Sequence, residues 1–131
     1  MRAIHALVCN PATPELSARP LIDLPEAGRL ARVFKVLAND TRLRLLHTLS
    51  RDGEVSMTDL ATAVSMKPQA VSNQLQRLVD LGILGSRRSG ANMLYRVVDP
   101  CVTSLLDLGL CLTETPAVER QRLAPASVLS R

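Results

Sequence analysis

Aromatic residues are nearly missing from this chain of 131 residues. They make up 2% of it, as one Tyr and one Phe without any Trp, whereas apolar residues together make up 47%. A core therefore has to be built from Leu, Val, Ala and Met, and such side chains favour packed helices over a β-sandwich or a barrel. The length suffices for one domain with a single modest core.

Long hydrophobic runs are also missing, and no stretch approaches the roughly 20 apolar residues that are needed to span a bilayer. The first nine residues hold one arginine and a short apolar run broken by His5, which is too short for a secretory signal. We therefore expect a cytoplasmic protein that has no membrane partner. The net charge of +4 allows a polyanionic partner without requiring one.

The sequence shows no motif of an enzyme active site: it has no phosphate loop, no paired carboxylates at a site and no His-Glu-x-x-His helix. A thiol nucleophile such as Cys101 would need a basic partner, and none is evident. Three cysteines are an odd count in a reducing compartment, so a disulfide framework is not expected. The cysteines are either buried apolar residues or ligands, and we expect no enzyme.

Helix signals divide the chain into three parts. Residues 1–23 and 116–131 contain prolines and show no sustained helix or strand period. We therefore predict a flexible arm over 1–23, a tail over 116–131 and the folded domain over 24–115. Four helices are expected first, because apolar residues recur there at helical spacing. Their start signals are, in chain order, Pro25, Asn39 or Asp40, Ser56 with Asp59 three residues on, and Pro68.

A β-hairpin and a last helix follow. Two extended segments, 83–88 and 93–98, flank a turn that contains Gly and Asn. The last helix begins at Asp99-Pro100 and carries a broad apolar surface of leucines. The predicted fold is mainly α, in the order α-α-α-α-β-β-α.

The third and fourth helices are joined by three or four residues, as in a DNA-reading helix-turn-helix. The exposed face of the fourth helix has no acid before Asp80, whereas an ordinary solvated helix more often alternates Glu and Lys. Uncharged hydrogen-bonding groups there can read base edges, and two cations flank them. The candidate base readers are Gln69, Ser72, Asn73 and Gln76, and the flanking cations are Lys67 and Arg77.

The hairpin adds a basic tip beside this helix. Arg87, Arg88 and Arg96 lie on or next to it, and residues 81–98 contain no Asp or Glu. A basic two-stranded tip can hold phosphate or enter the minor groove. We therefore expect double-stranded operator DNA as the partner.

Three stretches resemble the ArsR/SmtB family of metalloregulatory repressors. They are residues 37–46, reading LANDTRLRLL; residues 71–78, VSNQLQRL, with 82–84, GIL; and residues 87–90, RRSG, with Tyr95. The resemblance covers about residues 26–114. It implies a winged helix-turn-helix homodimer, joined through its first and last helices, that blocks transcription until an inducer binds. Gln74 departs from the family, whose members commonly have histidine there, which leaves the base preference open.

The resemblance also indicates where a metal could bind. Many members carry Glu-Leu-Cys-Val-Cys-Asp-Leu on the third helix, but Ser56 and Thr58 replace both cysteines here, so that arsenite and cadmium site is missing. Zinc sensors begin the last helix with Asp-x-His and add ligands about three turns later. This chain has Cys101 at the first position and Cys111 near the later one.

Thiolate in place of imidazole shifts the preference from zinc towards softer ions. Cys101 and Cys111 are about 15 Å apart along one helix, so a single metal cannot join them within it. Antiparallel last helices in a dimer would instead bring Cys101 to Cys111 of the partner subunit, which gives two equivalent sites. Cys9 of the arm is a third candidate ligand. Three sulfurs favour mercury(II), then arsenite, cadmium or lead as the inducer.

Two alternatives stay open for the cysteines. Cys101 and Cys111 could form an intersubunit disulfide that senses oxidant. Alternatively, the cysteines could be buried packing residues in a regulator that does not respond to metals. His47, Met57 and Met66 are interpreted as packing or rim residues, and His5 as a spare ligand of the arm.

Overall fold

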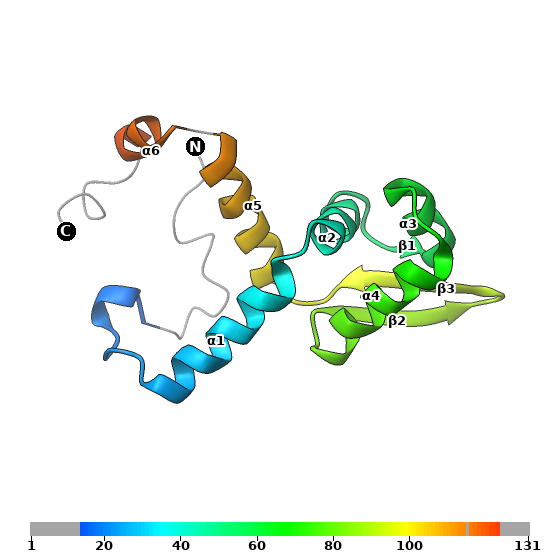
Figure 1. Ribbon diagram of the computed structural model, residues 1–131, viewed down its shortest axis with the longest axis horizontal. Coiled ribbons are helices and arrows are strands. Elements are labelled where there is room, and N and C mark those ends of the chain that lie inside the picture. Colours follow the sequence, from blue (N-terminus) through cyan, green and yellow to red (C-terminus); the bar gives the residue numbers. More distant parts are fainter. Residues whose placement is uncertain (1–13, 115, 124–131) are drawn as a thin grey trace.

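The computed structural model, which describes residues 14–114 and 116–123, consists mainly of helices over one small antiparallel sheet (Figure 1), and it confirms the predicted fold class. The helices are α1 (Leu24–Leu37), α2 (Asp40–Asp52), α3 (Met57–Val64), α4 (Pro68–Asp80), α5 (Pro100–Glu114) and α6 (Ala117–Leu123), preceded by the short 3-10 helix η2 (Leu16–Ala18). The strands are β1 (Val55–Ser56), β2 (Leu84–Ser89) and β3 (Asn92–Val97).

The helices begin at the residues that the sequence indicates. Asn39 caps α2, and its side-chain oxygen accepts the backbone N–H of Arg42 at 3.0 Å. Ser56 caps α3 by accepting the N–H of Asp59 at 3.1 Å. Prolines occupy the first turns of α1 and α4, where a missing N–H costs no hydrogen bond. These local bonds fix where α2 and α3 start, and so they fix the length of the loops between the helices.

The sheet has the strand order β1-β3-β2, with the predicted hairpin formed by β2 and β3. Gly90 has φ 61° in the turn between them, a left-handed conformation that glycine adopts without steric cost. Strand β1 was not predicted, because two residues are too short to show a period. It pairs Val55 with Tyr95 of β3, and this pairing joins the hairpin to the start of α3.

The core lies between α2, α3, α4 and the base of the hairpin. Helix α2 packs against α3, α5 and β3, and α4 packs against α3 and β2. The hairpin extends away from these helices as a wing (Figure 1). The fully buried large side chains are Leu45, Leu46, Leu49, Leu60, Val71, Leu75 and Leu78.

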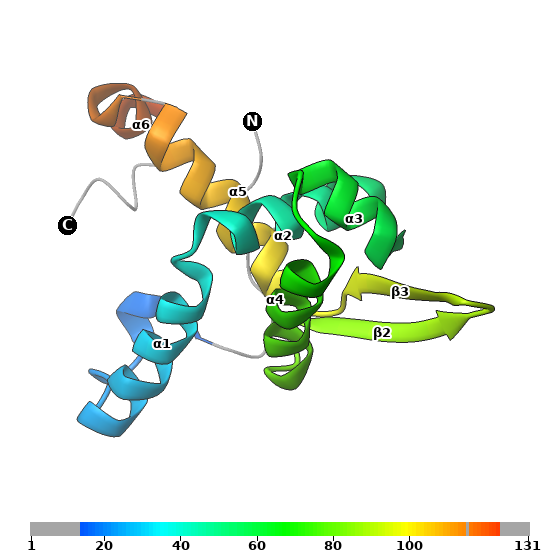
Figure 2. The same cartoon turned by 45° about the vertical axis from the view of Figure 1, so that its right-hand side comes forward.

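The first and last long helices contribute little to this core. Helix α1 buries only Val36 and Leu37, both at its C-terminal end, and α5 buries only Val102. Figure 2 shows both helices extending to the side opposite the wing. Phe34 of α1 is 49% exposed, and Leu112 of α5 is 65% exposed. The described part of the chain therefore leaves apolar faces of α1 and α5 exposed.

Helix α6 lies within the stretch that the sequence predicts as a tail. It follows Pro116, and an ion pair of 2.7 Å between Glu119 and Arg122, three residues apart, supports it. None of the helices in the described part of the chain is both long and apolar enough to span a membrane.

Truncating Leu75 should cost much more stability than truncating the exposed Leu81. Leu75→Ala removes a fully buried side chain and leaves a cavity, so the free energy of unfolding should fall by roughly 2–5 kcal/mol. Leu81 is 52% exposed, and Leu81→Ala should cost about 0.5 kcal/mol or less. Urea denaturation at one fixed protein concentration measures both. Equal decreases for the two variants would contradict this description of the core.

Candidate functional site

Helix α4 presents a row of neutral polar side chains to solvent. Its inner face is anchored by the buried Val71, Leu75 and Leu78, so the orientation of the outer face is fixed. Gln69, Asn73 and Gln76 are exposed on the outer face, and Ser72 is half-buried beside them. We call these four residues the reading row.

Three members of the reading row make hydrogen bonds along their own helix. The amide of Gln69 donates to Asn73 Oδ1 at 3.2 Å, and the amide of Gln76 donates to Asp80 Oδ1 at 2.8 Å. Because these bonded side chains are exposed, water or a base edge can replace their partners at little cost. The side chains of the row can thus exchange these bonds for bonds to a base edge.

Gln74 belongs to the packing of α4 and not to the reading row. Its side-chain oxygen accepts a hydrogen bond of 2.6 Å from Nε of Arg42 in α2. The same guanidinium donates to the carbonyl of Val36 at 3.0 Å. The glutamine at this position therefore fastens the reading helix to α2 and to the end of α1.

The turn between α3 and α4 consists of three residues, as the sequence predicts. Ser65 there has φ 56°, the left-handed conformation that ends α3, and its N–H bonds to the carbonyl oxygens of Ala61 and Thr62. Lys67 caps α4 with its backbone and leaves its side chain exposed. Arg77, in the last turn of α4, is also exposed. Cations thus stand at both ends of the reading row.

The three arginines of the wing are all solvent-accessible, but they are not equivalent. Arg87 forms a bidentate ion pair with Glu54, with Nε to Oε2 at 2.8 Å and a terminal nitrogen to Oε1 at 2.6 Å. Arg88 and Arg96 have no ion pair among the described residues. The positive charge that the wing presents therefore resides mainly on Arg88 and Arg96.

Glu54 was not predicted as part of this surface. It lies just before β1 and binds Arg87, which is 33 residues further along the chain. No local sequence pattern predicts a contact over that separation. The hydrogen bond from Arg87 lowers the pKa of the Glu54 carboxyl below its usual value, and the charge of Arg96 lowers it further. The same contact raises the pKa of Arg87. The pKa of the Glu54 carboxyl is lower in the folded state than in the unfolded state. The ion pair is therefore complete at any pH above the ordinary pKa of a glutamate, and it is lost only as the pH falls through the lowered, folded-state pKa.

Cys101 and Cys111 both lie on α5 but at its opposite ends. Cys101 is half-buried in the first turn, and its N–H donates to Asp99 Oδ1 at 2.9 Å. Its sulfur is disulfide-bonded, whereas Cys111 is an exposed free thiol, so the two are not bonded to each other. Cys9 and His5 lie outside the described residues. Over residues 14–114 and 116–123, no three His, Cys, Asp or Glu side chains gather as a metal site.

The structure gives the other candidate ligands ordinary roles. Ser56, at one of the family's third-helix metal positions, caps α3. Met57 and Met66 pack against the core, as expected. His47 is exposed at the rim of an apolar hollow of about 560 Å³ between α1, α2 and α5. Phe34, Leu105 and Leu112 also line this hollow, so it lies where α1 and α5 leave their apolar faces uncovered.

Comparisons with known proteins agree with this geometry. The family of winged helix-turn-helix DNA-binding domains matches residues 39–84, which span α2 to the start of β2. The crystal structure of the antimony-specific transcriptional repressor AntR is 61% identical, covering 82% of this chain and 96% of that one with a TM-score of 0.70.

Two further relatives are more distant. The transcriptional regulator NmtR of Mycobacterium tuberculosis is 38% identical over 86 residues, which are 66% of this chain and 71% of NmtR. A homodimeric winged helix-turn-helix domain of Mycobacterium bovis, from a possible ArsR-family regulator, is 30% identical. It covers 76% of this chain and 91% of that one with a TM-score of 0.63. The chain is a winged helix-turn-helix transcriptional regulator, not an enzyme, and it belongs to the ArsR/SmtB family of metalloregulatory repressors.

Proposed function

We propose that this protein binds operator DNA as a homodimer and is released by a thiophilic ion that its cysteine thiolates bind. The observation that carries the DNA half of the proposal is the reading row, a line of uncharged donors and acceptors on the outer face of a helix with a fully buried inner face. Such side chains match the hydrogen-bonding pattern of base edges in the major groove. The reading row would select sequence.

Cations around the row would hold the DNA backbone. Lys67 and Arg77 stand at the two ends of the reading helix, and Arg88 and Arg96 carry the unpaired charge of the wing. Contacts of this kind position the protein without reading sequence. The sequence predicts that Arg87 is a further phosphate contact. Because Arg87 is paired with Glu54, it would contribute less to phosphate binding until that ion pair opens.

The dimer would form through α1 and α5. Their exposed apolar side chains border a hollow that the described residues leave open, and burying such faces is favourable. A homodimeric relative of the same fold supports this arrangement. The twofold axis of the dimer would also place each ion ligand of α5 in two equivalent positions, one from each subunit. The dimer would therefore have two equivalent ion sites.

Cys101, Cys111 and Cys9 would be the ion ligands. Cys101 is half-buried at the start of α5, where its thiolate could share an ion with a second ligand. Cys111 is about 15 Å further along α5, so it would serve the site through the partner subunit. Three thiolates suit mercury(II), which the sequence favours, and equally the trivalent arsenic and antimony ions. Identity of 61% with an antimony-specific repressor leads us to place antimony(III) first.

Sensing of oxidant is a second candidate function, and the disulfide at Cys101 is the observation that favours it. An oxidant would convert two thiolates into that bond, with the electron pair passing to the oxidant. The two functions differ in what they need: ion-induced release proceeds in excess reductant, whereas disulfide-induced release does not.

Changing the Glu54–Arg87 pair and changing Arg88 should have opposite effects on DNA binding. Arg88→Ala should flatten the slope of log affinity against log salt by about one, similarly on all sequences. Glu54→Gln should steepen it by up to about one, because Arg87 becomes available to phosphate. Fluorescence anisotropy over a salt series measures both. Glu15→Gln is the control, since Glu15 is exposed and has the same charge. A Glu54→Gln slope equal to that of the control would contradict the role of the pair.

Sedimentation should show a dimer at micromolar protein. Phe34→Asp should shift it towards the monomer, because a charge would be buried between α1 and α5. Leu81→Asp, at an exposed leucine outside both helices, should leave the dimer intact. A stable wild-type monomer would contradict the interface and the shared ion site together.

Removing a thiolate should abolish the response and spare DNA binding. In reductant, antimony(III) should release the wild type from DNA, and it should no longer release Cys101→Ser or Cys111→Ser; Cys9→Ser should respond more weakly. Met57→Leu, which removes a sulfur from the core, should respond normally. Ion binding should weaken as pH falls, because the thiolate is the ligand. A panel of antimony(III), mercury(II), arsenite, cadmium(II), lead(II) and zinc(II) ranks the inducers. Release of all three serine variants would place the sensor elsewhere.

A further inference from the structure

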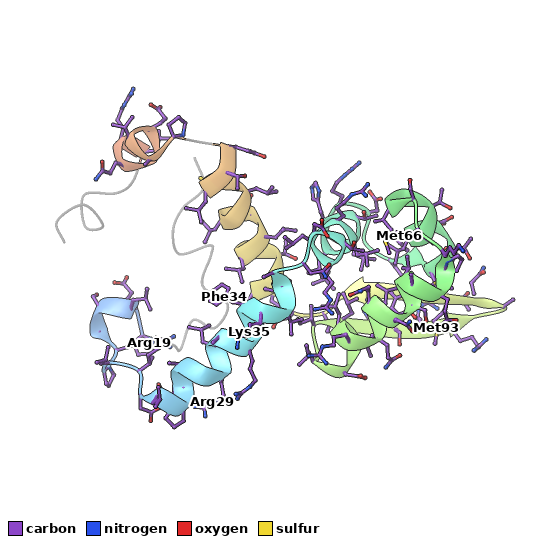
Figure 3. The ribbon with its side chains drawn as sticks, in the orientation of Figure 1. Arg19, Arg29, Phe34, Lys35, Met66 and Met93 are labelled. Carbon is purple, nitrogen blue, oxygen red and sulfur yellow. The ribbon has the colours of Figure 1, made fainter. Side chains whose placement is uncertain are left out.

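A second hollow, of about 410 Å³, lies between α1, the C-terminal end of α4 and the start of α5. Five of its eleven lining residues are basic, and Figure 3 labels two of them, Arg29 and Lys35, along α1. Its one acidic residue is Asp99. The cationic lining residues are Arg29, Arg32 and Lys35 of α1, Arg42 of α2 and Arg77 of α4.

Most of this positive charge has no counter-charge among residues 14–114 and 116–123. Asp99 accepts the N–H that begins α5, and Arg42 is committed to Gln74 and to a backbone carbonyl. The other four cations form no ion pair with any residue of the described chain. Like charges that line one hollow repel each other, and an anion placed among them removes that repulsion.

The walls of the hollow would strengthen its hold on an anion. Val33, Val36, Ile83 and Val102 line it beside the cations, and the last three of these are buried in the core. Apolar walls exclude water and so reduce the screening of charge. Guanidinium groups match the geometry of phosphate with two parallel hydrogen bonds.

The hollow adjoins the reading row and stays open in the proposed dimer. Arg77 directly follows Gln76 of the row on α4. On α1, at about 100° per residue, Arg29 and Arg32 lie on a different side from Leu30 and Phe34. Figure 3 likewise shows Phe34 towards α5 and Arg29 away from it. A partner that covers the apolar side of α1 would therefore leave the basic side accessible.

We infer that this hollow binds a phosphate group of the DNA backbone, and that it extends the DNA contact from the reading helix onto α1. The inference rests on the proposed function, because it requires DNA against the reading row. Arg29, Arg32 and Lys35 then join Arg77 as phosphate ligands. Asp99 and Val102, on either side of Cys101 in the sequence, form part of the wall, so the proposed phosphate site adjoins one of the proposed ion ligands.

The double variant Arg29→Gln, Arg32→Gln tests the site. Affinity is measured by fluorescence anisotropy over a salt series, on a duplex enriched from random DNA by the wild type and on a scrambled duplex. The salt slope should fall by about 0.9 for each phosphate that the variant no longer neutralises, equally on both duplexes. The control is Arg19→Gln, Arg51→Gln, which removes the same charge from exposed positions outside the hollow and should change the slope less.

Each outcome is decisive when thermal melting shows that the variants fold. A slope equal to that of the control overturns the inference and leaves the proposed function standing, whereas wild-type protein that binds neither duplex overturns both. Sodium pyrophosphate at constant ionic strength serves as a small-anion probe. If it raises the melting temperature of the wild type but not of the Arg29, Arg32 variant, while the DNA slope stays at the control value, the hollow takes a small anion and the DNA contact is wrong.

Discussion

The uneven distribution of buried side chains determines how the rest of this molecule works. Seven large side chains are fully buried, and all of them lie on α2, α3 and α4. Helix α5, with 15 residues, buries only Val102 within its own chain. Because burial of apolar area is the main source of stability, the reading helix is held firmly and α5 loosely. The outer helices thus need a further surface, and a second copy of the chain provides one in the proposed dimer.

In the proposed mechanism, this division separates the DNA-reading unit from the sensing unit. The reading row sits on a helix fastened by Leu75, Leu78 and the Arg42–Gln74 bond. Both cysteines of the described chain lie on α5, and an exposed contact of 3.4 Å between Thr103 and Ser50 joins this helix to α2. An ion that moves α5 would therefore shift the two reading units relative to each other more easily than it would distort either one. Interfaces between packed elements are where such two-state shifts usually occur.

Local signals in the sequence predict most of the fold and miss the contacts between distant residues. Asn39 and Ser56 predict helix starts because each side chain accepts the backbone N–H only three residues further along the chain. The Glu54–Arg87 and Arg42–Gln74 bonds join residues 33 and 32 positions apart, and nothing in local periodicity pairs them. The basic hollow likewise collects its cations from three helices. The sequence therefore predicts which polar and basic residues are exposed on α4 and the wing better than it predicts which of their charges are available.

The central claim is that the cysteine site and the DNA surface are energetically coupled, and coupling between two binding sites is reciprocal. The most direct measurement is the affinity of antimony(III) for the reduced protein, free and saturated with DNA, by titration against a competing thiol chelator. Our account predicts that DNA weakens ion binding by the same factor by which the ion weakens DNA binding. Equal ion affinities in the two states, while the ion still lowers occupancy of DNA, would contradict it.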